Sequence, residues 1–141
     1  GIYTVKIENP RFVRQDYTLR LVSMAVDRAE KEPNDSAALA TELTVNQPCT
    51  GVLSSEKDVD YYRLTFAETT AVTFRFSFAQ SANTNTAFVL NIEQNGKTQW
   101  TANIRGDSGG IEQQLRFPAG EYYVRVKPSA WLSAVYTISV D

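Results

Sequence analysis

The sequence predicts an all-β protein: an antiparallel β-sandwich of the jelly-roll or Greek-key type, with one short helix near the start of its complete unit. Three observations support this prediction. Apolar and polar residues alternate along several segments, as they do in strands that bury one face. Asn, Gly and Pro residues that favour turns separate these segments. The strands so defined recur about every 8–12 residues, a spacing typical of two packed antiparallel sheets.

The one helical pattern lies in residues 36–43, where Ala and Leu residues cluster behind Asp35. Asp35 suits the N-cap position because its carboxylate can accept a hydrogen bond from a backbone N–H of the first turn. This helix would span about two turns at most. The clearest strand pattern follows in residues 72–78, where four large apolar residues alternate with polar ones, so one face of this strand is predicted to be buried.

Further strands are predicted downstream, and each ends at a turn signal. Asn95-Gly96 favours a two-residue hairpin turn because both residues accept a positive φ. Pro118 to Gly120 forms a second tight turn, and the glycine-rich residues 106–110 form a loop. The strands joined by these turns are expected at residues 88–92, 98–104, 111–117 and 122–126.

The start of the chain recurs at its end. Gly1 to Ile7 aligns with Gly120 to Val126, and Tyr17 to Leu21 aligns with Tyr136 to Val140 at the same offset. A period this long is domain-sized, well above the roughly 20–50 residues of solenoid repeats. We therefore expect a tandem array, in which residues 1–27 are the closing hairpin of a preceding unit with a linker, and residues 28–141 are a complete sandwich.

The predicted N-terminal hairpin would leave strand edges unpaired. Such edges favour pairing with other strands, so the hairpin is expected to dock on this domain or to hold a homodimer together.

Composition excludes several functional classes. The chain of 141 residues suffices for one domain. Its net charge is −2 and its Lys and Arg residues are scattered along the sequence, so no basic surface for nucleic acid is expected. No apolar run reaches the roughly 20 residues that cross a bilayer. The sequence contains no His, which excludes Ser-His-Asp chemistry and His-bound zinc. Cys49 is the only cysteine and is expected to fill space in the core.

Oxygen-bearing side chains gather in residues 30–35 and 58–60. Alternate residues share a face in an extended chain, which places Glu30 beside Glu32 and Asp58 beside Asp60. Hard cations such as Ca²⁺ take about six to eight oxygen ligands, and these segments could supply a site. Pro-Asn-Asp-Ser is equally good turn and N-cap chemistry, and acidic loops are commonly just solvated. The residue types leave both interpretations open.

Four motifs follow one another along the chain, and their order matters for the comparison below: Glu32-Pro-Asn-Asp-Ser36, Asp58-Val-Asp-Tyr-Tyr62, Gly120-x-Tyr-x-Val and Tyr136-Thr-Ile-Ser-Val. From about Glu30 to Asp141 the chain resembles the bacterial pre-peptidase C-terminal domain. That family is a secreted, non-catalytic β-sandwich attached to extracellular peptidases, often in tandem, and is related to the collagen-binding domains of bacterial collagenases. The resemblance implies a secreted or cell-surface bacterial protein.

Calcium-binding members of this family hold the ion with a Glu-x-Glu-x-Asn-Asp linker and with acidic residues at an Asp-x-Asp-Tyr strand. The resemblance therefore implies a structural Ca²⁺ ion that ties the linker between units to the sandwich. Ser55 is a weaker candidate ligand. Carried over by position, the expected ligands are Glu30, Glu32, Asn34, Asp35, Asp58 and Asp60.

The expected function is that of a non-catalytic accessory module which spaces, stabilises or targets the adjacent domains of its parent protein, such as a peptidase. Catalysis by Asp58 and Asp60 is not expected, because residues at i and i+2 point along one strand and do not face each other across a cleft. The first alternative is a polymer-binding module for collagen-like protein or glycan, with Tyr123 and Trp131 stacking on the ligand. The second is a spacer without metal.

Overall fold

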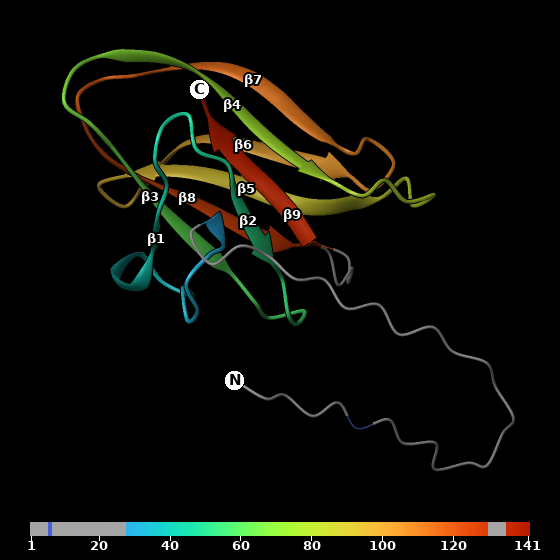
Figure 1. The fold of residues 1–141 in the computed structure, drawn as a ribbon. Helices are drawn as coiled ribbons and strands as arrows, with labels where there is room; N and C mark the ends of the chain where they lie inside the picture. The colour runs from blue at the N-terminus through green and yellow to red at the C-terminus, as the bar shows by residue number, and fades with distance from the viewer. Residues whose placement is uncertain (1–5, 7–27, 130–134) are drawn as a thin grey trace, which may run out of the picture.

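The computed structural model describes residues 6, 28–129 and 135–141, which contain two packed β-sheets (Figure 1). The predicted antiparallel β-sandwich is therefore confirmed. Residues 1–5 and 7–27, which hold most of the predicted N-terminal hairpin and its linker, lie outside the described residues, as does Trp131. No helix of the described part is long and apolar enough to cross a membrane.

One sheet has five strands and the other has four. Neighbouring strands run antiparallel, except that β1 and β3 are parallel. The five-stranded sheet has the order β1 (Thr41–Glu42), β3 (Asp60–Phe66), β8 (Gly120–Pro128), β5 (Thr86–Gln94) and β6 (Lys97–Arg105). The four-stranded sheet has the order β2 (Cys49–Val52), β9 (Val135–Val140), β4 (Thr70–Phe78) and β7 (Gly110–Phe117).

The predicted turn at Asn95-Gly96 is present and joins β5 to β6 as a hairpin. Both residues have a positive φ, 51° for Asn95 and 70° for Gly96, as a two-residue hairpin turn requires. The C-terminal copy of the recurring segment differs from a hairpin. Its two strands, β8 and β9, lie in different sheets and each has two neighbours, so this C-terminal copy is a pair of central strands, one in each layer of the sandwich.

The short helix predicted near the start of the unit is present as a single 3₁₀ turn, η2 (Ala37–Leu39), and is shorter than residues 36–43 allow. Ser36 takes the N-cap position in place of Asp35, and its side chain makes no capping hydrogen bond. The chain then turns into an edge strand, because Thr41–Glu42 pair with β3. This tertiary pairing outweighs the weak helical propensity of a short Ala-rich run.

The core lies between the two sheets and is rich in aromatic rings. The predicted alternation in β4 is confirmed: Phe74 and Phe76 are buried, and Phe76 stacks on Tyr136 with ring centroids 4.9 Å apart. Trp100 turns inward and packs edge-on against Phe74 at 5.7 Å. Tyr122 is buried as well, as expected for an inward strand residue. Each such side chain contributes roughly 1.5–3 kcal/mol by leaving water, which fixes the positions of the neighbouring strands.

Candidate metal site

Residues 28–36 form a linker segment that runs beside β2 and reaches the start of β3. Glu30 holds the segment to β2 twice: its N–H donates to the Thr50 carbonyl at 3.0 Å, and its Oε1 accepts from the Val52 N–H at 2.6 Å. The Asn34 carbonyl accepts from the Tyr61 N–H of β3 at 2.9 Å. Because β2 and β3 belong to different sheets, the linker segment ties the two layers together.

Three carboxylates meet where the linker segment crosses between the sheets. One oxygen each from Glu30, Glu32 and Asp60 lies within 4.8 Å of the others. Asp60 is fully buried and Glu32 is exposed. Within the described part of the chain, no Lys or Arg side chain forms an ion pair with any of the three. Among the described residues, negative charge is therefore concentrated at this point without an ion-pair partner to offset it.

Two buried oxygen atoms in this cluster, Asn34 Oδ1 and Asp60 Oδ1, accept no hydrogen bond from the residues that the structure describes. The Asn34 side chain is fixed, since its Nδ2 donates to Glu30 Oε2 at 3.2 Å, and the residue is completely buried. An unpaired buried acceptor costs about 1–3 kcal/mol. These oxygens have the chemistry of ligands for a hard cation, because Ca²⁺ takes carboxylate and amide oxygens.

The hydroxyls of Tyr62 and Tyr136 continue the cluster into the core. Tyr62 donates to Glu30 Oε2 at 2.7 Å, and Tyr136 is hydrogen-bonded to Asp60 Oδ2. The two hydroxyl oxygens lie 2.7 Å apart. Two phenols carry too few protons to fill all of these contacts, and a proton on Asp60 completes the chain from Asp60 through Tyr136 and Tyr62 to Glu30.

The charges in the cluster agree with that protonation. Burial, reinforced by the negative charges of Glu30, Asp58 and Glu32, raises the pKa of the Asp60 carboxyl from 3.8 to about 8. Partial desolvation and the charge of the neighbouring Glu30 also raise the pKa of Glu32, although its side chain is largely exposed. The ionised forms of Asp60 and Glu32 are thus both disfavoured. A cation bound between these carboxyls would stabilise their ionised forms.

The remaining predicted ligands lie at the margin of the cluster. Asp58 is buried and its Oδ2 accepts from the Ser54 N–H at 2.5 Å, while its charge acts on both Glu32 and Asp60. Asp35 is exposed. A shallow depression beside the carboxylates is lined by Glu32, Pro33, Asp35, Ser54, Ser55, Lys57 and Asp58. The structure thus brings Glu30, Glu32 and Asp60 together, with Asn34 adjacent.

Tyr62, Tyr136 and Gly51 also shape this site, although the sequence motifs do not predict a role for them there. Period-two patterning marks the tyrosines only as core residues, and says nothing of their hydroxyls. Gly51 lies on β2, where a Cβ atom would overlap both hydroxyl oxygens. A glycine inside a strand pattern often marks a close approach of another group, and this signal could have identified the site.

The residues predicted to bind a polymer are only partly described. Tyr123 is half-buried on β8, its partner residue on β3 is Arg63, and its hydroxyl donates to Glu121 Oε1 at 2.5 Å. On the same face, Arg125 forms an ion pair with Glu93 at 3.3 Å. Trp100 is half-buried and packs against Phe74 of the core.

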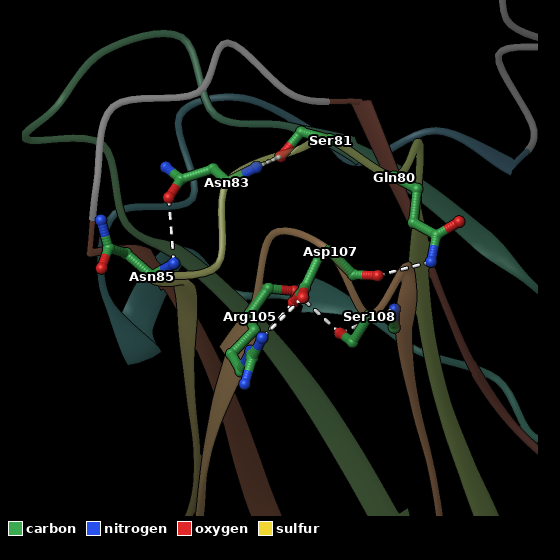
Figure 2. A network of polar contacts seen from close by, with 8 residues as sticks. Gln80, Ser81, Asn83, Asn85, Arg105, Asp107 and Ser108 are labelled. Atoms are coloured by element: carbon green, nitrogen blue, oxygen red, sulfur yellow. Dashed lines mark hydrogen bonds and ion pairs between the residues drawn. The ribbon is translucent and has the colours of Figure 1, made fainter.

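The loop 79–85 and the turn between β6 and β7, with Arg105 at the end of β6, carry a second polar network, drawn in Figure 2. Arg105 and Asp107 form a bidentate ion pair with distances of 2.9 and 2.6 Å. Ser108 Oγ donates to the Arg105 carbonyl at 2.8 Å, and the Asn85 N–H donates to Asn83 Oδ1 at 2.9 Å. These contacts satisfy one another within exposed loops, so the network orders the loops and does not resemble the acidic cluster.

Comparison with known proteins bears on the fold. No family model matches the chain, and no curated protein matches it in sequence. Among solved structures, the pre-peptidase C-terminal domain of the collagenase from Bacillus anthracis superposes with a TM-score of 0.60 at 15% sequence identity, covering 72% of this chain and 94% of that domain.

Two further structures are less similar. The periplasmic lysozyme inhibitor PliG of Aeromonas hydrophila gives a TM-score of 0.42 at 19% identity, covering 72% of this chain and 97% of PliG. A β-glucosidase of Paenibacillus barengoltzii gives 0.36 at 16% identity, covering 78% of this chain and 12% of the enzyme. Neither likeness is strong enough to carry an argument. The resemblance predicted from the sequence motifs is confirmed in the fold: this chain is a β-sandwich of the kind found in a pre-peptidase C-terminal domain.

Proposed function

We propose that this chain is a non-catalytic accessory module of a secreted or cell-surface bacterial protein, and that a structural Ca²⁺ ion ties its linker segment to the sandwich. The observation that carries the proposal is the meeting of Glu30, Glu32 and Asp60 beside the unpaired oxygen of buried Asn34. A bound cation supplies the positive charge that no described side chain brings to this cluster.

The donor set favours a hard cation. The gathered atoms are carboxylate and amide oxygens, which suit Ca²⁺, whereas zinc sites are built mainly from His and Cys. The chain contains no His. Its only thiol, that of Cys49, is buried, and burial raises its pKa to about 11, so it is not a metal-binding thiolate. Glu30, Glu32, Asp60 and Asn34 would hold the ion, with Asp58 and Asp35 supporting it by their charge.

The role of the ion would be structural. Glu30 already bonds to backbone groups of β2, and Asp60 begins β3, so a cation between them would strengthen the connection of the linker segment to both sheets. Anything that binds the folded state alone stabilises it by mass action. A stiffened linker would fix the orientation of the neighbouring domain relative to the sandwich. In this way the module would space and stabilise the adjacent domains of its parent protein.

The accessory role rests on the fold and on the chemistry of the cluster together. The pre-peptidase C-terminal domain with which this chain shares its fold is part of a collagenase. The buried carboxyl of Asp60 is hydrogen-bonded to Tyr136, and oxygens of Glu30 and Glu32 converge with it within 4.8 Å, which suits a shared cation. The expected partners are therefore adjacent domains of the same secreted protein, such as a peptidase.

Calcium binding can be tested directly on the whole chain. Tyr62 and Tyr136 lie beside the carboxylates, so they should sensitise luminescence from Tb³⁺ bound in place of Ca²⁺, and added Ca²⁺ should quench the signal by competition. Ca²⁺ should also raise the melting temperature over that in a chelator. Asp60→Asn should abolish both effects, and Glu56→Gln, the same carboxyl-to-amide replacement at an exposed loop residue, should leave both intact.

Two results would contradict the proposal: the wild-type protein shows neither luminescence nor a calcium-dependent melting shift, or Asp60→Asn retains both. Should Asp60→Asn fail to fold, the exposed Glu32→Gln variant replaces it, and in that variant both calcium effects should be weaker than in the wild type.

The polymer-binding alternative is favoured by one observation, the shared outward face of Tyr123 and Arg125 on β8. Retention of the chain on immobilised collagen or glycan, lost in Tyr123→Ala, would support this alternative. Equal elution of the wild type and the variant would reject a binding role for Tyr123.

A further inference from the structure

The sandwich has four edge strands among its described residues, and three of them are protected from pairing with another chain. Edge strands expose unpaired backbone N–H and C=O groups, so proteins usually shorten, distort or cover them. β1 has only two residues, and the linker segment lies against β2 through the hydrogen bond from Glu30 to Thr50. β6 is paired to β5 with two register shifts and carries Lys97 and Arg105 at its ends.

The fourth edge, β7, is long and regular. Its eight residues pair with β4 without a register shift, and the strand contains no Pro. Figure 1 shows β7 at the margin of the fold beside β4, with no described strand on its other side. Among the described residues, β7 is thus neither shortened nor distorted nor covered by another strand.

The hydrogen bonds of β4 show which groups of β7 face outward. Thr73 of β4 exchanges both of its backbone hydrogen bonds with Asp141, at 2.7 and 3.0 Å, so its N–H and C=O point away from β7. Gln114 lies opposite Thr73. It is therefore in a non-hydrogen-bonded pair, and its own N–H and C=O point to the free edge. By the same alternation, the backbone groups of Glu112 and Arg116 also point outward.

The side chains of these three residues are self-complementary. A two-fold axis through Gln114, perpendicular to the sheet, pairs two copies antiparallel and keeps their outer faces on the same side. Glu112 of each copy then lies opposite Arg116 of the other, which gives two opposite-charge pairs. Shifting this pairing by two residues in either direction loses both opposite-charge pairs. Arg116 has no ion-pair partner within the described residues, and Glu112 is 63% exposed although it also contacts Arg75 at 2.9 Å.

We propose that β7 is a homodimerisation edge, where two copies of this chain pair antiparallel about Gln114 and join their four-stranded sheets into one. Glu112, Gln114 and Arg116 then each exchange backbone hydrogen bonds with the second copy. The Gln113 side chain, which donates to the Gln114 carbonyl at 3.1 Å, gives way to the second copy's N–H. Because the contact is one strand wide, the dimer is weak and depends on concentration.

Sedimentation equilibrium of the whole chain tests this pairing over a range from about 10 μM to about 1 mM. The wild type should shift toward twice its monomer mass as concentration rises. Gln114→Lys places like charges opposite each other at the axis and should weaken the dimer at least about tenfold. Gln99→Lys, the same change on the exposed face of the protected edge β6, should behave as wild type.

A charge-exchange experiment provides a second readout. Arg116→Glu and Glu112→Arg should each be monomeric alone, since each sets like charges opposite each other, and each should keep its fold by circular dichroism. An equal mixture should dimerise again, because opposite charges then meet at both positions.

The proposal is overturned by a wild type that stays monomeric throughout, by a dimer that survives Gln114→Lys, as one held by residues 1–27 would, or by a mixture that stays monomeric.

Discussion

Replacing Glu32 by glutamine should stabilise the metal-free protein and at the same time weaken its binding of Ca²⁺. Glu32 is exposed, so the change removes a charge without opening a cavity. Glutamine retains an oxygen that can accept the hydrogen bond from the Asn34 N–H, which is 3.1 Å long in the structure. The variant therefore isolates the electrostatic contribution of one carboxylate in the cluster.

The magnitude follows from the spacing of the charges. Oxygens of Glu30 and Glu32 lie within 4.8 Å of each other. At that distance the Coulomb repulsion is about 1 kcal/mol in water and about 3.5 kcal/mol at an effective dielectric constant of 20. Because Glu32 is exposed, the lower value applies, and relief of repulsion should raise the melting temperature in a chelator by roughly 4 °C for a domain of this size. Loss of one ligand charge should weaken Ca²⁺ binding about tenfold or more, equivalent to about 1.4 kcal/mol.

Thermal unfolding in chelator and in saturating Ca²⁺ measures both effects, and calorimetric titration gives the affinity. Glu56→Gln is the matched control, since it changes the same charge on an exposed residue of the neighbouring loop, and it should alter stability by less than about 0.5 kcal/mol. The reasoning is refuted if Glu32→Gln lowers stability in chelator, or if its calcium-induced shift equals that of the wild type.

Two further predictions concern the buried part of the site. Gly51→Ala should lower stability by about 2–5 kcal/mol, because overpacking costs about 1–3 kcal/mol and the displaced Tyr62 and Tyr136 hydroxyls lose their hydrogen bonds. Thermal melts should also show a loss of the calcium response, and a change below about 1 kcal/mol would contradict the close contact. In metal-free buffer, stability should fall as the pH rises between about 4 and about 8, because folded Asp60, with a pKa near 8, retains a proton that the unfolded chain has released. The slope should not exceed about 1.4 kcal/mol per pH unit for this group. The stabilisation by calcium should grow over the same pH range, and Asp60→Asn should flatten the pH dependence of both quantities. A free energy of unfolding that does not change with pH would be evidence against a protonated Asp60.

The sequence predicts the layers of this fold better than its connections. Alternation identifies strands such as β4, because a half-buried sheet imposes a period of two on any sequence that forms it. Alternation does not tell which sheet a strand joins, so β8 and β9 read as a hairpin although they lie in different sheets. The Ala-rich run after Asp35 suggests a two-turn helix, and only the pairing of Thr41–Glu42 with β3, a contact between distant residues, shortens it to one turn.

The candidate site was predictable in its residue types and not in its geometry. Glu30, Glu32 and Asp60 are recognisable as oxygen donors from their spacing and from the family motif, and the structure brings these three together. Asp35 stays in solvent and Asp58 bonds to a backbone N–H, a distinction that depends on the path of the linker segment across β2. No local pattern encodes that path.

The burial of Cys49 gives the protein a built-in reporter of local opening. This thiol lies on β2, the strand that Glu30 holds, and its pKa near 11 keeps it in the unreactive protonated form. Since it is the sole cysteine of the chain, a maleimide or iodoacetamide added to the native protein can modify nothing else by thiol chemistry. The rate of that modification therefore measures how often β2 unfolds locally at the edge of the sandwich. An ion that binds the linker segment to β2 would lower this rate.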